Sequence, residues 1–245
     1  MVAEPATWSD PRLADTRFGD VRWFARIDST NRYLLERAAA GESEGVVAVA
    51  DEQTAGRGRL GRSWTAPAGA ALLVSALLRP PVPPERRHLV TLAAACSLLD
   101  ALAALAVPVP EAGVKWPNDV LVDGGKVAGI LAEADARGAV VVGIGVNLRG
   151  DWFPPELADT ATAVAVDRTD LLVAWLRAYD TWLGRLDEVV AAARARSATL
   201  GRRVRVQATD GSFEGTARDL TAEGFLLVDD RVVTAADVVH LRPAD

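Results

Sequence analysis

The segment from Gly56 to Trp64 contains three arginines and three glycines in nine residues, with no acidic residue among them. Glycine lets backbone N–H groups approach a ligand closely, and the planar guanidinium group of arginine binds phosphate or carboxylate oxygens at two points. Trp64 adds a flat apolar surface. We therefore expect a loop that folds over an anion attached to a flat ring system.

Conformational entropy suggests that this loop responds to its ligand. Ordering three glycines costs about 1.5–3 kcal/mol more than ordering three alanines. Two or three charge-assisted hydrogen bonds, each worth about 1.5–3 kcal/mol, offset that cost only when an anion is bound. The segment is therefore predicted to be mobile when empty and ordered when liganded. Taken alone, it also fits a solvated arginine-rich turn or a segment that binds nucleic acid.

Arginine supplies nearly all of the positive charge in the chain. Lysine and arginine together number 27, and only Lys115 and Lys126 are lysines. A lysine where arginine ordinarily serves suggests a need for a compact ammonium group. Both lysines are therefore candidates for the site.

The composition is that of a globular protein with an acidic balance of charge. The 245 residues are 50% hydrophobic and 24% charged, with a formal net charge of −6. This length allows one large domain plus a small one, and the acidic balance argues against a surface coated with nucleic acid. One cysteine and two histidines exclude an internal disulfide and a Cys/His metal cluster.

No targeting or membrane segment is expected. The first twenty residues contain Pro, Asp, Arg and Trp without an apolar run, which argues against a signal peptide. No stretch of about 18–20 residues is apolar and free of charge, so no membrane span is predicted. We expect a cytoplasmic protein.

Apolar patterning predicts a mixed α and β first part followed by a small all-β part. Strands are expected at 21–27, 46–50, 70–78, 113–116, 120–122, 126–134 and 139–148, and helices at 32–40, 85–105 and 169–198. Residues 1–20 are expected to form a loose lead-in. Further strands are expected at 204–208, 213–220, 225–228 and 232–241. We therefore divide the chain into a larger domain at 1–198 and a small β-barrel at 199–245, too short to bury much core alone.

Polar residues and glycines at the ends and centres of these elements are candidates for ligand contacts. One of Ser29, Thr30 and Asn31 is expected to cap the helix that follows, which leaves the other side chains to bind the hydrogen-bonding edge of a ligand. Gly143 and Gly145 interrupt a strand and suggest a ligand lying close against the backbone.

Two turns are predicted from short motifs. Pro117-Asn118-Asp119 ends one strand, and Asp123-Gly124-Gly125 is typical of a β-hairpin. Asn147 stands at the exit of the strand at 139–148.

Cysteine and histidine are assigned structural roles. Cys96 lies among alanines and leucines with no cationic neighbour to lower its pKa, so it is interpreted as a small core residue. His88, near the start of the same helix, and His240, in a C-terminal strand, are expected at exposed or capping positions rather than as catalysts.

Several of these motifs occur together and in order. They are Ser29-Thr30-Asn31, the loop at 53–64, Lys115-Trp116-Pro117-Asn118-Asp119, Lys126 with Gly129, and Gly143-Ile144-Gly145-Val146-Asn147. Over about residues 21–245 this arrangement resembles the biotin–protein ligases. The resemblance implies an α+β fold of the class II synthetase-like kind, in which a mixed, largely antiparallel sheet carries helices on one side and is followed by a small SH3-like β-barrel.

The resemblance implies a two-step reaction. Biotin and Mg-ATP give biotinyl-5′-AMP and pyrophosphate, and biotin then passes to one lysine of a biotin carboxyl carrier domain of an acyl-CoA carboxylase. Attack of a carboxylate on ATP is slow because two anions repel, so the protein must supply positive charge and positioning rather than a nucleophile. The implied cofactors are ATP and Mg²⁺, and a monomer or weak homodimer is expected.

The resemblance also implies roles for individual residues. The expected biotin contacts are Ser29, Thr30, Asn31, Gln53, Gly56, Arg57, Gly58, Arg59, Trp64, Lys126, Gly129 and Gly143. The expected ATP contacts are Arg59, Arg62, Asn118, Lys126 and Asn147. Lys126 and Arg59 are the expected catalytic residues, and Asp119 is a candidate Mg²⁺ ligand. Lys115 either acts directly or only anchors its turn.

Two alternatives stay open. A lipoate ligase or octanoyl transferase shares the general fold. The transferase needs a thiol near its lysine, and a lipoate ligase should lack the Gly-Arg-Gly-Arg loop at 56–59. A nucleic-acid-binding Arg-Gly segment predicts a basic face, against which the pI of about 5.1 counts. Some ligases carry a helix-turn-helix repressor domain. Only about twenty residues precede the first expected strand here, so an enzyme without repressor activity or nucleic-acid binding is expected.

Overall fold

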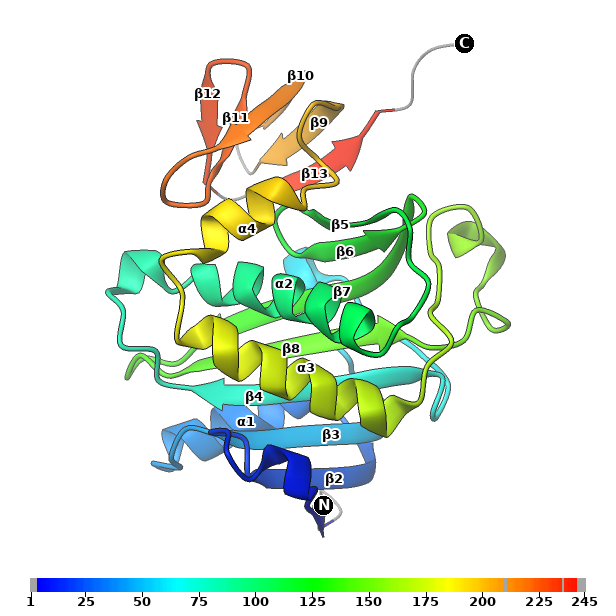
Figure 1. The fold of residues 1–245 in the computed structure, drawn as a ribbon, viewed down its shortest axis with the longest axis vertical. Coiled ribbons are helices and arrows are strands. Elements are labelled where there is room, and N and C mark those ends of the chain that lie inside the picture. The colour runs from blue at the N-terminus through cyan, green and yellow to red at the C-terminus, as the bar shows by residue number, and fades with distance from the viewer. Residues whose placement is uncertain (1–3, 209–210, 235, 242–245) are drawn as a thin grey trace.

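A computed structural model describes residues 4–208, 211–234 and 236–241. Its larger part is an eight-stranded mixed sheet, and a five-stranded antiparallel sheet follows towards the C-terminus (Figure 1). Both parts agree with the predicted α+β architecture.

The large sheet has the strand order β1-β2-β3-β4-β8-β7-β6-β5. In that order the strands are β1 (Ala6–Trp8), β2 (Asp20–Ile27), β3 (Val46–Gln53), β4 (Ala71–Leu78), β8 (Val140–Asn147), β7 (Gly125–Ala134), β6 (Asp119–Val122) and β5 (Ala112–Lys115). Strands β2 and β3 are parallel, and the other pairs are antiparallel. The hairpin predicted at Asp123-Gly124 is confirmed, and both residues have positive φ (49° and 79°), as a type I′ turn requires.

Helices cover both faces of this sheet, so the prediction of helices on one side is wrong. Helices α2 (Leu89–Ala104) and α3 (Arg168–Leu183) pack together on one face, whereas α1 (Thr30–Ala39) packs on the other (Figure 1). The reason lies in the central strands, which are apolar at successive positions. On β3, Val47 belongs to the core under α2 and α3, and Ala48 belongs to the core under α1. A strand with two apolar faces needs cover on both.

Three further predictions of secondary structure are corrected. The helix expected at 169–198 ends at Leu183, and a separate helix, α4 (Val189–Ala195), begins after a turn that contains Gly184, a poor helix former. The strand expected at 232–241 is two strands that pair with different partners. The lead-in contains β1, which pairs with β2 as an edge strand. Short 3-10 helices lie at Pro11–Leu13, Arg59–Gly61, Pro84–Arg86 and Pro155–Leu157.

The small sheet has the order β12-β11-β10-β9-β13. Its strands are β9 (Arg203–Ala208), β10 (Gly211–Leu220), β11 (Leu226–Val228), β12 (Arg231–Val233) and β13 (Asp237–His240). It is held against the large part by the Trp116 indole, whose Nε1 donates to the Gly224 carbonyl oxygen at 3.0 Å. His240 lies near this junction, within 3.1 Å of the Thr199 hydroxyl. Burial lowers the pKa of His240 to about 4, so its ring is neutral near pH 7.

Among the described residues, one helical segment, Pro84–Ala104, is long and apolar enough to cross a membrane by length and composition. In the structure it is a core helix, buried between α3 and the sheet. Burial of this kind is what the central helix of a globular protein shows.

Cys96 lies on this helix and is fully buried, as predicted. Its burial raises the pKa of the thiol to about 12, and a thiol that stays protonated is a poor nucleophile. We expect Ellman's reagent to leave the native protein unmodified over an hour at pH 8 and to modify one thiol per chain in denaturant. Rapid labelling of the native protein would contradict this placement of Cys96.

Candidate active site

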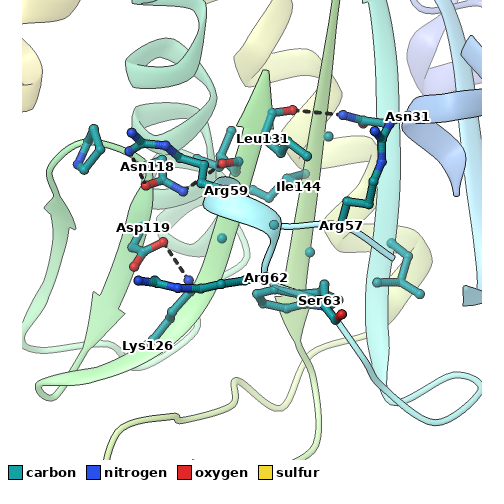
Figure 2. A pocket seen from close by; sticks show the side chains of 18 of the residues that line it. Asn31, Arg57, Arg59, Arg62, Ser63, Asn118, Asp119, Lys126, Leu131 and Ile144 are labelled. Atoms are coloured by element: carbon teal, nitrogen blue, oxygen red, sulfur yellow. Dashed lines mark hydrogen bonds and ion pairs between the residues drawn. The ribbon is translucent and has the colours of Figure 1, made fainter. Parts of the chain in front are cut away.

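A cavity of about 180 Å³ lies on the face of the large sheet that α1 partly covers (Figure 2). Its walls come from the start of α1, from strands β4, β7 and β8, from the arginine loop (Gly56–Trp64) and from β13 of the small sheet. Most of the predicted site residues line it: Ser29, Thr30, Asn31, Gln53, Arg57, Gly58, Arg59, Arg62, Trp64, Lys115, Asn118, Asp119, Lys126, Gly129 and Gly143. The structure therefore brings together residues that are far apart in the sequence.

Three glycines leave part of the cavity floor as bare sheet backbone. Gly129 on β7 and Gly143 and Gly145 on β8 all line it. A Cβ atom at Gly143 would lie 2.2 Å from Oδ1 of Asn31, and one at Gly145 would lie 2.5 Å from the Trp64 ring. No side chain fits at these two positions unless its neighbours move. The glycines thus allow Asn31 and Trp64 to lie directly over the strands.

A buried network of hydrogen bonds lines one end of this floor. Ser29 caps α1 by accepting from the backbone N–H of Arg32, so one residue of the predicted triplet is a cap. The Thr30 hydroxyl lies 3.0 Å from Oε1 of Gln53 and 2.7 Å from the Ser75 hydroxyl. Ser75 in turn donates to Oδ1 of Asn31 at 2.6 Å. These groups can donate to and accept from a polar ring.

Each arginine of the loop is held by a different element, and Figure 2 shows the contact of Arg59 with Asn118. Nη2 of Arg57 lies 2.9 Å from a carboxylate oxygen of Glu133 on β7. Nη1 of Arg59 donates to Oδ1 of Asn118, in the turn before β6, at 3.1 Å.

The third arginine, Arg62, forms an ion pair with Asp237 on β13. The loop therefore lies over the cavity and joins the large sheet to the small one.

Lys126, on β7, lies beside the end of the arginine loop (Figure 2). Its Nζ atom is 2.7 Å from Oδ1 of Asp119 and 5.7 Å from the centre of the Trp64 ring, which forms a wall of the cavity. The Trp64 Nε1 atom is buried and has no hydrogen-bond partner among the described residues, so it is available to donate to a ligand. An ammonium group beside an unpaired indole donor suits a ligand that has both an anionic and an apolar part.

Lys115 lines the same cavity, within a strongly charged neighbourhood. Burial lowers the pKa of Lys115 from its ordinary value, and Asp119 and Asp237 oppose this effect. Nearby Lys126 and Arg62 add to it by repulsion. A bound anion would relieve that repulsion, so the charges favour a phosphate or carboxylate here.

Two predicted site residues do not line the cavity. Gly56 lies at the base of the arginine loop, where its carbonyl oxygen accepts from the N–H of Trp64 at 3.0 Å. A Cβ there would meet the Trp64 carbonyl oxygen at 2.3 Å, so glycine is needed for the two ends of the loop to meet. The Asn147 amide donates to the carbonyl oxygens of Lys126, at 3.3 Å, and of Thr162. In this structure Asn147 therefore holds the backbone of Lys126 and not the cavity wall.

Three residues of the site were missed. Ser75 is the one polar residue in the run Ala71–Leu78, a signal that was available in the sequence. Asp237 is buried at 7% exposure beside an apolar run, which is a similar signal. Glu133 gave no such signal, because a glutamate near the end of a strand is ordinary.

Comparison with known proteins agrees with this geometry. Residues 23–151 match the biotin/lipoate A/B protein ligase family, and residues 199–241 match the biotin protein ligase C terminal domain. The chain belongs to the biotin/lipoate A/B protein ligase family, as the motifs indicated.

Individual members of this family show how similar the chain is to known biotin ligases. The chain is 44% identical to the biotin–[acetyl-CoA-carboxylase] ligase of Mycobacterium tuberculosis, over 89% of this chain and 88% of that one. It is 40% identical to the enzyme of the same name from Paracoccus denitrificans, over 78% and 88%. Among solved structures it resembles the biotin protein ligase of Aquifex aeolicus in complex with biotin and ATP, with a TM-score of 0.80, 28% identity and coverage of 90% and 99%.

The bare floor generates a testable prediction. In Gly143→Ala the new methyl group must displace Asn31, because the two would lie 2.2 Å apart. We expect the Kd for biotin to rise about tenfold or more, the equivalent of about 1.4 kcal/mol for a lost buried hydrogen bond.

Calorimetric titration with biotin measures this effect. Gly184→Ala is the matched control, because its Cβ meets nothing closer than 3.4 Å and its φ is −77°. Equal biotin affinity in the two variants would contradict the assignment of the floor.

Proposed function

We propose that this protein is a biotin–protein ligase that couples ATP cleavage to the attachment of biotin to a lysine of a carrier domain. The carrier belongs to an acetyl-CoA carboxylase, as the names of the relatives indicate. The observation that carries the proposal is the cavity itself, in which a glycine floor with a polar network adjoins a cluster of cations. A ring with N–H and carbonyl groups fits the first part, and phosphates fit the second.

In the first step, a carboxylate oxygen of biotin attacks the α-phosphorus of ATP and the bond to pyrophosphate breaks. The biotin carboxylate, the α-phosphate and the leaving pyrophosphate are all anionic. The transition state of this step therefore depends on fixed positive charge. We assign Lys126 to the biotin carboxylate and the α-phosphate, and Arg59 and Arg62 to the phosphates. Thr30 and Asn31 hold the ring, with Trp64 as its wall.

In the second step, the amine of the carrier lysine attacks the carbonyl carbon of biotinyl-5′-AMP. A C–N bond forms, the C–O bond to AMP breaks, and the amine loses a proton. The arginine loop lies over the cavity where this acyl-adenylate would form. Exclusion of water from that cavity would protect the adenylate from hydrolysis.

Magnesium fits the proposed nucleotide part of the site. Carboxylate oxygens are preferred ligands of Mg²⁺, and Asp119 and Asp237 both line the cavity. We propose that Asp119, together with phosphate oxygens, holds the ion, which would neutralise charge on ATP. No cluster of three or more His, Cys, Asp or Glu side chains occurs in the part of the chain that is described, so the phosphates would supply the other ligands.

The remaining expectations belong to the same proposal. We propose a cytoplasmic enzyme that is a monomer or a weak homodimer, without repressor activity. We also propose that the division near residue 198 separates a catalytic domain from a small C-terminal domain. The thiol-dependent transferase chemistry is disfavoured by Cys96, which is buried in the core with a raised pKa.

The role of Lys126 gives the test of the function. We expect wild-type protein with biotin and Mg-ATP to release pyrophosphate and to add one biotin to a carrier domain, as seen by mass spectrometry. Lys126→Ala should lower the rate of biotin-dependent pyrophosphate release by about 100-fold or more, because it removes fixed charge at the reacting centre. The fold should be retained, as judged by circular dichroism.

Arg26→Ala is the control, since it removes a positive charge from an exposed side chain outside the cavity. It should keep the wild-type rate. A Lys126→Ala variant that releases pyrophosphate at close to the wild-type rate would refute the role given to Lys126.

A further inference from the structure

Glu133 occupies an unusual place between the two halves of the site. One of its carboxylate oxygens, Oε2, accepts from Nδ2 of Asn31 at 2.8 Å and from Nη2 of Arg57 at 2.9 Å. Asn31 belongs to the polar network of the floor, and Arg57 begins the cationic part of the loop. A single atom thus connects the part of the cavity suited to a ring with the part suited to an anion.

Glu133 itself does not line the cavity of about 180 Å³. It lines a second, wider cavity that also has the arginine loop as a wall. Its effect on a ligand in the inner cavity must therefore pass through Asn31 and Arg57.

The first effect of Glu133 is to orient the Asn31 amide. An ionised carboxylate only accepts hydrogen bonds, so the NH₂ group of Asn31 must point towards it. The Leu131 carbonyl oxygen, 3.2 Å from the same Nδ2 atom, favours the same orientation. Oδ1 of Asn31 then points the other way, to the Ser75 hydroxyl and to the floor at Gly143. Asn31 therefore presents an acceptor, which matches a ring N–H donor.

The second effect of Glu133 is to hold the start of the loop. The Arg57 side chain is 43% exposed and that of Glu133 is 23% exposed. An ion pair with this exposure contributes little to stability, so it can be broken and remade when the loop moves. The position of this ion pair matters more than its strength, because it joins Arg57 of the loop to Glu133, which orients Asn31.

We propose that Glu133 is a positioning residue that makes closure of the arginine loop depend on an occupied ring site. With a ring N–H bound at Oδ1, Asn31 is fixed against Glu133, and Glu133 is fixed against Arg57. The loop then closes over the ligand. This inference rests on the proposed function, since it takes the ring to be that of biotin.

Glu133→Gln tests the coupling. Glutamine has nearly the same shape but carries no charge, and its own NH₂ group allows the Asn31 amide to turn over. We expect KM for biotin in pyrophosphate exchange to rise about fivefold to tenfold, as for one weakened hydrogen bond. We expect kcat to stay within about twofold, because Glu133 does not touch the reacting atoms.

Trypsin supplies a second measurement, because it cleaves after the loop arginines Arg57, Arg59 and Arg62. Biotin should slow cleavage in the loop of the wild-type protein and should have little effect on Glu133→Gln. Glu36→Gln is the matched control, on an exposed face of α1, and should behave as wild type in both assays. Glu133→Asp keeps the carboxylate but is shorter, so its KM should lie between those of wild type and Glu133→Gln.

Each outcome decides the matter. Normal protection of the loop by biotin in Glu133→Gln would overturn the proposal whatever its KM, as would a wild-type KM or a large fall in kcat at unchanged KM. If Glu133→Gln does not fold, Glu133→Asp decides it, and an unchanged KM there overturns the proposal. If wild-type protein itself shows no biotin-dependent exchange, the proposed function has failed instead.

Discussion

The site depends on a patch of one sheet face where three glycines leave the backbone bare. On the opposite face of the same strands, residues such as Val74, Val142 and Ile144 pack under α2 and α3 and form the larger core. Because side chains alternate along a strand, the residues between them point to the other face, where Leu73 and Val141 pack under α1 and Ser75, Gly143 and Gly145 leave room for a ligand. The sheet is thus packed on both faces, and these small residues leave an opening on the face that α1 covers.

Register keeps the open positions together. Ser75 on β4 pairs with Gly143 on β8, and Gly143 pairs with Leu131 on β7. A shift of β8 by one residue would turn Val142 and Ile144 towards the cavity and Gly143 into the larger core. The burial of the opposite face therefore holds the site in register. This is how an ordinary hydrophobic core can position groups for ligand binding.

Positive charge is concentrated around the cavity. The protein is acidic overall, at −6, yet three arginines and two lysines surround one cavity. Acidic partners hold three of these cations in place, and they come from three separate elements: Glu133 on β7, Asp119 on β6 and Asp237 on β13. Through Asp237 the small C-terminal sheet takes part in the site. Its position beside the arginine loop is thus part of the geometry of the cavity.

The sequence allowed much of this to be predicted, and the physical reasons for the rest are clear. Turns and caps depend on a few neighbouring residues, so the hairpin at Asp123-Gly124 and a cap within Ser29–Asn31 could be predicted. Most of the residues that the motifs indicated also line one cavity. The break after Leu183 was missed because the apolar spacing continues through it, and the pairing of Glu133 with Asn31 and Arg57 was missed because it depends on tertiary contacts. Asn147 shows the opposite case, a polar residue near the site whose amide binds backbone.

Isothermal titration of the purified protein with biotin and then with lipoate, each with and without Mg-ATP, tests the central claim most directly. The bare floor and its polar network should bind biotin tightly, because the biotin ring has N–H groups for the acceptors that line the cavity. Lipoate, which has no ring N–H, should give little heat, and pyrophosphate should appear when Mg-ATP joins biotin. Binding of lipoate without biotin, or of neither, would contradict this account of the site.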